Sequence, residues 1–166
     1  MILITGSSGN IGKELAKLLA QSTSKVRAMC RTQDELEQFT KLGIEAVIGD
    51  FNDAESLRQA MQGCERLFLL AAAVPEQSQH YRLAIDMAVE AGIKQIVKIS
   101  TGDSNLDSHI AWAKASAESD HYLRSKPVNW TLLRATGFML NIAGIEKHDF
   151  AGLSAQSNRR GQSKLD

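Results

Sequence analysis

Short runs of apolar residues alternate along the chain with longer stretches in which apolar residues recur every three or four positions. The short runs are typical of strands buried on both faces, and the longer stretches are typical of helices with one apolar face. This alternation predicts an α/β fold, a doubly wound parallel sheet of the Rossmann-like type with helices on both faces. Six strands are expected, at residues 2–5, 25–30, 44–49, 66–72, 95–100 and 129–135. Five helices are expected between them, at about 11–21, 33–42, 53–62, 77–91 and 110–125.

Local signals mark several of these boundaries. Asn52 followed by Glu55 has the spacing of a capping box and predicts the start of the third helix. Gly43 and Gly92 stand where the second and fourth helices should end, because glycine readily adopts a positive φ there. The final residues are polar and rich in Ser, Gln and Gly. We therefore expect one domain over residues 1–148, followed by a polar, disordered tail over residues 149–166.

Composition and charge narrow the class of protein. Of the 166 residues, 43% are hydrophobic and 23% are charged, and 19 basic residues balance 19 acidic ones. The balanced charge gives no overall field that would attract nucleic acid or an anionic membrane. No apolar run approaches the roughly 20 residues of a membrane helix, and the first strand begins too close to Met1 to leave room for a signal peptide. We expect a cytoplasmic protein with no membrane segment.

The cysteines and histidines show no metal or disulfide pattern. Cys30 and Cys64 lie in or beside apolar segments without C-x-x-C spacing, so we expect two reduced thiols rather than a disulfide. The four histidines lack the spacing of metal ligands. We therefore assign no metal site.

A glycine-rich turn, TGSSGNIG, joins the first strand to the first helix. Its three glycines have the spacing G-x-x-G-x-x-G, which differs from the G-x-G-x-x-G of ordinary dehydrogenases. One glycine permits a sharp turn, another lets the main chain approach a pyrophosphate, and the third lets the helix pack close to the sheet. The helix N-terminus then offers free N–H groups to a phosphate. The residues expected to bind it are Gly6, Ser7, Ser8, Gly9, Asn10, Ile11 and Gly12. A tight turn with no ligand is the alternative.

The end of the second strand indicates which cofactor is preferred. An NAD site commonly carries Asp or Glu at this point, to accept hydrogen bonds from the ribose hydroxyls. This chain has Arg31 there instead, and no carboxylate before Asp34. A guanidinium can pair with the additional 2′-phosphate of NADP. We therefore expect NADP(H) to be preferred over NAD(H), the alternative being an ordinary solvated arginine.

The ends of the third and fourth strands are placed to meet the rest of a dinucleotide. Asp50 can accept a hydrogen bond from the exocyclic amine of adenine, and Phe51 can lie alongside the ring. Asp50 could equally serve the start of the helix that follows. Ala71 and Ala72 end the fourth strand with small side chains, which suits a main chain passing close to a ribose, although small core residues would look the same.

Together these residues resemble the short-chain dehydrogenase/reductase superfamily, in particular its atypical NmrA-like branch. The shared segments are TGSSGNIG, VRAMCR, GDF, VKIST at 97–101 and WTLLRATGFMLN at 130–141. The resemblance implies an NAD(P)-binding sheet of six or seven strands and a small C-terminal substrate region. The resemblance also implies one of the activities found in different members of that branch, which are quinone reduction, other reductions, and cofactor sensing without turnover.

The catalytic pattern of the superfamily is incomplete in this chain. Catalytic members use Y-x-x-x-K together with Ser or Thr after the fifth strand. The resemblance makes Lys114 the counterpart of the lysine and Ser100 or Thr101 the counterpart of the hydroxyl, but Ile110 occupies the tyrosine position. Ile110 cannot transfer a proton. His109, which titrates near neutrality in its ordinary state, is one alternative proton donor. A quinone-like acceptor whose product takes its proton from solvent is the other alternative.

A second departure is that the chain does not continue into the strand, helix and substrate-covering region usual in the branch. Two functions therefore stay open. One is an NADP(H)-dependent oxidoreductase acting on a quinone-like or small carbonyl acceptor, with Lys114 holding the ribose and Thr101 near the acceptor. The other is a non-catalytic NADP(H)-binding regulator with a protein partner, and a truncated form lacking its substrate region is a further alternative.

Overall fold

Strands and helices alternate along the chain as the hydrophobic pattern predicts, and this computed structural model describes residues 1–22 and 24–135. The strands are β1 (Ile2–Ile4), β2 (Val26–Cys30), β3 (Glu45–Ile48), β4 (Arg66–Leu69), β5 (Gln95–Thr101) and β6 (Asn129–Ala135). The helices are α1 (Asn10–Ala20), α2 (Gln33–Lys41), α3 (Ala54–Met61), α4 (Gln77–Glu90) and α5 (Ala111–Arg124). The largest difference from the expected bounds is that β4 ends at Leu69. The expected boundary at residue 148 and the expected tail, 149–166, lie outside the described residues.

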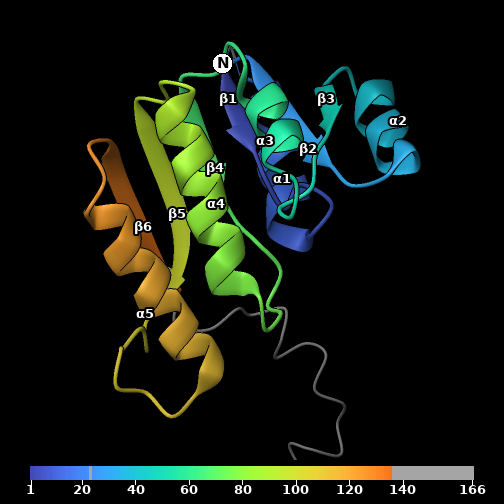
Figure 1. Cartoon of the computed structure of the whole chain (residues 1–166). Helices are drawn as coiled ribbons and strands as arrows, with labels where there is room; N and C mark the ends of the chain where they lie inside the picture. Colours follow the sequence, from blue (N-terminus) through green and yellow to red (C-terminus); the bar gives the residue numbers. More distant parts are fainter. Residues whose placement is uncertain (23, 136–166) are drawn as a thin grey trace, which may run out of the picture. The chain divides into compact units, whose positions relative to one another are not determined.

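The strands form one sheet in the order β3-β2-β1-β4-β5-β6 (Figure 1). At its centre β1 pairs in parallel with β2 and with β4, so that Leu3 lies opposite both Arg27 and Leu67. The chain extends the sheet outward from β1 to β3, crosses back over β1, and then extends it the other way. This order confirms the doubly wound Rossmann-like fold. Because the connections after β1 and β4 leave in opposite directions, a crevice is expected at the carboxyl ends of these two strands.

Two apolar layers hold the helices to the sheet. On one face α3, α4 and α5 pack against the strands through side chains such as Leu57, Ile85 and Leu123, none of which has exposed surface (Figure 1). On the other face α1 and α2 pack through Ala16 and Phe39. Full burial of one large aliphatic side chain contributes roughly 1.5–3 kcal/mol, so these layers position the strand ends that form the crevice. No helix in the described part of the chain is both long and apolar enough to span a membrane.

Helix boundaries agree with the glycine signals but not with the expected capping box. Gly43 and Gly92, with φ of 73° and 74°, follow the ends of α2 and α4, which confirms their predicted role. The cap of α3 is Asp53, whose carboxylate accepts the N–H of Glu55 at 3.0 Å. The capping box predicted at Asn52 is therefore wrong by one residue. Asn52 instead directs its main-chain and side-chain N–H groups back along the chain, away from the helix.

A buried charge pair interrupts the apolar layer beneath α5. Lys98 on β5 has no exposed surface, and its Nζ lies 2.7 Å from Oδ1 of Asp120 on α5. The hydroxyls of Ser100 and Ser104 donate to Oδ2 of Asp120, at 2.6 and 3.0 Å. The Lys98 Nζ also lies 4.4 Å from the centroid of the Tyr81 ring. Burial lowers the pKa of Lys98, although the neighbouring Asp120 carboxylate opposes that shift. These contacts of Asp120 link α5 to β5 and to the segment that follows β5.

Candidate functional site

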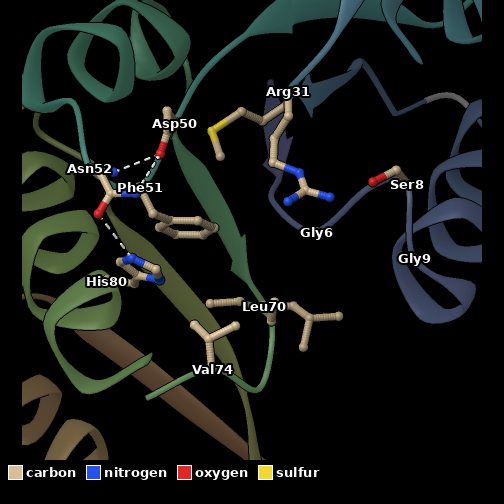
Figure 2. A pocket seen from close by; sticks show the side chains of 13 residues that line it. Gly6, Ser8, Gly9, Arg31, Asp50, Phe51, Asn52, Leu70, Val74 and His80 are labelled. Atoms are coloured by element: carbon tan, nitrogen blue, oxygen red, sulfur yellow. Dashed lines mark hydrogen bonds between the residues drawn. The ribbon is translucent and has the colours of Figure 1, made fainter. Parts of the chain in front are cut away.

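A cleft of about 370 Å³ lies at the carboxyl ends of β1 and β4, where the sheet order predicts a crevice (Figure 2). The glycine turn, the exits of β2 and β3, the segment after β4 and the first turn of α4 contribute its walls. Eight residues expected from the sequence to contact a cofactor line it: Gly6, Ser8, Gly9, Arg31, Asp50, Phe51, Ala71 and Ala72. The cleft brings these together from segments separated by up to 66 positions along the chain.

The glycine turn is held by contacts that side chains would block. Gly6 has a φ of 61°, and a Cβ there would lie 2.8 Å from the carbonyl oxygen of Leu70. A Cβ on Gly12 would lie 2.2 Å from the carbonyl oxygen of Gly6. Gly9 donates its N–H to that same Gly6 oxygen at 3.1 Å, which closes the turn. Close contacts with the main chain therefore exclude any residue larger than glycine at positions 6 and 12.

The N-terminus of α1 is open to an anion. Gly9 is its N-cap and supplies no side-chain hydrogen bond, and the first turn contains no acidic residue. Asn10, Ile11 and Gly12 do not line the cleft with side chains, so they can contribute only through first-turn N–H groups. The side chain of Ser7 does not line the cleft, so the phosphate contact expected of Ser7 can come only from its main chain. This side chain is fully buried, and its hydroxyl donates to the carbonyl oxygen of Met29 beneath the turn.

Arg31 lies at the exit of β2, on the same side of the cleft as the glycine turn. Figure 2 shows its side chain directed into the cleft, with the Ser8 hydroxyl turned toward it. Its main-chain N–H donates to the Glu35 carboxylate at 2.8 Å, which fixes the start of α2. Within residues 1–22 and 24–135, no carboxylate forms an ion pair with its guanidinium. The positive charge therefore remains available to an anionic ligand.

At the other end of the cleft, polar and aromatic side chains from the segment after β3 and from α4 meet. Oδ1 of Asp50 accepts two hydrogen bonds from Asn52, from the main-chain N–H at 2.8 Å and the side-chain amide at 3.0 Å. The amide oxygen of Asn52 lies 3.1 Å from Nε2 of His80. The rings of Phe51 and His80 are stacked, with centroids 5.6 Å apart and planes 21° from parallel (Figure 2). Asp50 thus organises its own loop as well as facing the cleft.

The floor of the cleft follows β4. Ala71 is buried, and its main-chain N–H donates to the hydroxyl of Tyr81 at 3.3 Å. Burial raises the pKa of Tyr81, so this hydroxyl stays protonated and neutral. Ala72 is exposed beside it. These small side chains leave the main chain of this segment accessible to a ligand.

Five residues of the lining were not expected from the sequence: Met29, Asn52, Leu70, Val74 and His80. Nothing in the local sequence of His80 points to the end of β3. The available signal was topological, since the helix after β4 must begin beside the crevice. Among the described residues, no three or more His, Cys, Asp or Glu side chains lie together in an arrangement that could hold a metal ion.

The residues expected to act in catalysis lie outside this lining. Lys114 is exposed on the first turn of α5, and Thr101 is the last residue of β5, where its hydroxyl accepts the N–H of Asp103. Ile110 is the N-cap residue of α5 and is 48% exposed, beside an exposed His109. Ser100, the alternative hydroxyl, is buried against α5. The structure therefore places no described proton donor at the position that the superfamily's tyrosine would occupy.

Comparison with known proteins matches residues 6–157 to a family described as NAD(P)H-binding. The chain belongs to this family. It is 28% identical over 143 residues to the NAD(P)H azoreductase of Xenophilus azovorans, covering 86% of this chain and 50% of the relative. It is also 28% identical over 137 residues to quinone oxidoreductase 2 of Escherichia coli, covering 81% and 48%. The chain thus spans about half the length of the curated relatives it matches.

Solved structures agree with the fold and the family. The triphenylmethane reductase of Citrobacter sp., complexed with NADP(H), superposes with a TM-score of 0.77 at 22% identity, covering 84% of this chain and 50% of that one. An NADPH-dependent quinone oxidoreductase from Escherichia coli, complexed with NADPH, has a TM-score of 0.74 at 28% identity, covering 81% and 48%. These matches confirm the resemblance to the atypical, NmrA-like branch.

The cleft of this family member fits a nicotinamide dinucleotide. Any Cβ at Gly6 or Gly12 would fill the space where the main chain turns, so the turn presents bare backbone to the cleft. The uncapped first turn of α1 supplies N–H donors suited to a pyrophosphate. The stacked Phe51 and His80 rings supply a flat wall suited to a base. Phosphate-binding and base-binding features therefore occur in one cleft.

Proposed function

We propose that this chain is an NADP(H)-dependent oxidoreductase that transfers hydride to a quinone-like or small carbonyl acceptor. The observation that carries the proposal is the arrangement of the Arg31 guanidinium and the open N-terminus of α1 along one cleft. The relatives named as azoreductase and quinone oxidoreductase support a reductase in the general sense. When bound, NADPH supplies the hydride, and this chain's residues hold and orient it.

The charge pattern of the cleft favours NADP(H) over NAD(H). The turn at the end of β2 offers a guanidinium where an NAD site would offer a carboxylate. A guanidinium can donate two parallel hydrogen bonds to a phosphate, and such charge-assisted bonds are stronger than neutral ones. NADH lacks that phosphate and gains nothing from Arg31. The preference therefore depends on one side chain and can be tested by removing it.

The test is the variant Arg31→Ala, with Arg66→Ala as the matched control because Arg66 is an exposed arginine at the opposite, amino end of β4. We expect Arg31→Ala to weaken NADPH binding by about 10- to 100-fold while NADH binding changes less than about twofold. Arg66→Ala should change neither. Titration calorimetry measures both affinities. Equal losses for NADPH and NADH in Arg31→Ala would refute the preference.

A non-catalytic, NADP(H)-sensing regulator is the second candidate, and the isoleucine at position 110 favours it. Turnover and binding separate the two functions. We expect NADPH oxidation above the rate of the free cofactor with at least one member of a panel of quinones, azo dyes and aldehydes. Micromolar NADPH binding without any such rate would leave the regulator, with a protein partner in place of an acceptor.

A further inference from the structure

The hydrogen bonds at the base-binding end of the cleft determine which nitrogen of His80 carries a proton. Ionised Asp50 can only accept hydrogen bonds, so the group of Asn52 that faces Asp50 must be its amide nitrogen. The amide oxygen of Asn52 is then the atom that faces His80, at 3.1 Å from Nε2. Because that oxygen is an acceptor, Nε2 of His80 must be the donor.

A fixed proton on Nε2 leaves the other ring nitrogen with a free lone pair. In neutral imidazole, the nitrogen without a proton is a hydrogen-bond acceptor, so Nδ1 of His80 accepts. Figure 2 shows this second nitrogen on the side of the ring away from Asn52, facing the space bordered by Leu70 and Val74. His80 is only half-buried, so a ligand in the cleft can reach it. The chain from Asp50 through Asn52 thus presents one acceptor to the cleft.

The aromatic pair next to this acceptor shows how a base would lie. A flat ring inserted between two others needs about 3.5 Å on each side, or about 7 Å in total. The centroids of Phe51 and His80 are 5.6 Å apart, so no third ring fits between them. A base therefore lies outside the pair, and beside the pair its polar edge can meet Nδ1. The 6-amino group of adenine is a donor on such an edge.

We propose that His80 is a specificity-determining residue for the adenine half of the cofactor, its Nδ1 accepting a hydrogen bond from the adenine 6-amino group. This inference depends on the proposed binding of NADP(H) in the cleft. It makes His80 an acceptor for this amine in addition to Asp50, whose Oδ1 already accepts two hydrogen bonds from Asn52 and whose Oδ2 is still an acceptor. Asn52 is then a positioning residue that acts through the protonation state of Nε2.

The test compares NADPH with its reduced hypoxanthine analogue, in which a carbonyl oxygen replaces the 6-amino group. An oxygen facing Nδ1 would bring two acceptors together, so we expect the full chain to bind the analogue about tenfold more weakly than NADPH. In His80→Phe, a ring is kept for stacking on Phe51 while both nitrogens are lost, and the ratio of affinities should fall to about one. Because the ratio is measured on one protein, it does not depend on a change in stability.

Two further variants distinguish a specific role from a structural one. Asn52→Ala removes the oxygen that holds the proton on Nε2, so the ratio should fall to between one and the value of the unmodified chain. His121→Phe changes an exposed histidine on α5, outside the cleft lining, and should keep the ratio. A ratio that persists in His80→Phe, or that disappears in His121→Phe, would overturn the inference. Equal binding of both dinucleotides by the unmodified chain would overturn this inference alone, whereas binding of neither would overturn the proposed function as well.

Discussion

Replacing Asp120 with Asn would test how the buried pair with Lys98 contributes to stability. The substitution removes the negative charge but keeps the size of the side chain and one oxygen acceptor. Lys98 has no exposed surface and Asp120 is 3% exposed, so water cannot take the place of the lost charge. Breaking a buried ion pair in this way destabilises a protein by about 3–5 kcal/mol, because one charge is left without compensation.

The ionisation of Lys98 sets an upper limit to this loss. The ordinary pKa of a lysine is 10.5, and burial already lowers the pKa of Lys98 in the unmodified protein. Without Asp120, the folded variant can release the proton of Lys98 instead of burying a charge. Releasing it at pH 7, about 3.5 units below the ordinary value, costs about 1.4 kcal/mol per unit. The loss of unfolding free energy from this source therefore cannot exceed about 5 kcal/mol at pH 7.

The release of this proton also predicts how the unfolding free energy of Asp120→Asn depends on pH. Without Asp120, burial lowers the pKa of Lys98 further, and between that lowered pKa and 10.5 the unfolded chain binds one more proton at this residue than the folded variant. Stability therefore rises with pH by up to about 1.4 kcal/mol per unit, until pH approaches 10.5 and the unfolded chain also loses the proton. In the unmodified protein the Asp120 carboxylate opposes the lowering of the Lys98 pKa by burial, so Lys98 keeps its charge to a higher pH than in the variant. Its contribution changes only between its lowered folded pKa and 10.5.

Urea unfolding followed by the fluorescence of the two tryptophans measures these free energies at pH 7, 8 and 9. The matched control is Glu65→Gln, because this carboxylate is exposed and pairs with the exposed Lys94 at the surface. Its loss should be about 1 kcal/mol or less and should not change over this pH range. A loss below about 1 kcal/mol for Asp120→Asn, or one of equal size at pH 7 and pH 9, would refute the reasoning.

Two other predictions concern the glycine turn and the thiols. Gly12→Ala places a Cβ 2.2 Å from the Gly6 oxygen, so we expect a loss of about 2 kcal/mol or more in thermal unfolding and no calorimetric NADPH binding. In the control Gly43→Ala, the new Cβ meets no atom within 4 Å. This variant should lose only the roughly 1–2 kcal/mol that a positive φ costs a residue with a side chain, and it should bind NADPH normally. Normal NADPH binding by Gly12→Ala would contradict the packing argument. Burial raises the pKa of the Cys30 and Cys64 thiols. At pH 8 both thiols should therefore react slowly with a disulfide reagent until urea unfolds the protein. Fast reaction of the native protein would show that the thiols are not buried.

The fold was predictable because its signals are repeated along the chain. Each strand is a short apolar run and each helix has an apolar face, so an error at one element would not change the alternation. The glycine turn was predictable for a different reason, since backbone geometry at Gly6 and Gly12 excludes other residues. The cap of α3 was predicted wrongly because two neighbouring residues are both suited to that role. Asp53 and Asn52 can both cap a helix, and only the path of the chain decides between them.

The candidate site was predicted in the parts that lie next to strand ends and missed where distant segments meet. Arg31, Asp50 and Phe51 lie within three residues of the ends of β2 and β3, so the parallel sheet places them at one edge. His80 reaches the same cleft from a helix and depends on how α4 packs against the sheet. Ser7 shows the reverse case, because its position in the turn is correct but its hydroxyl faces Met29 beneath the cleft. Orientation of a side chain within a turn is not encoded in a spacing pattern.

Among the described residues, the lining of the cleft is encoded between Gly6 and His80, ahead of β5, α5 and β6. As the protein is synthesised, the ribosome therefore releases these lining residues before β5 and β6. Pairing of β4 with β1 completes the crevice, and α4 follows immediately in the emerging chain. A ligand that binds only folded structure stabilises it by mass action. Abundant cofactor in the cell can therefore assist the folding of the nascent amino-terminal half.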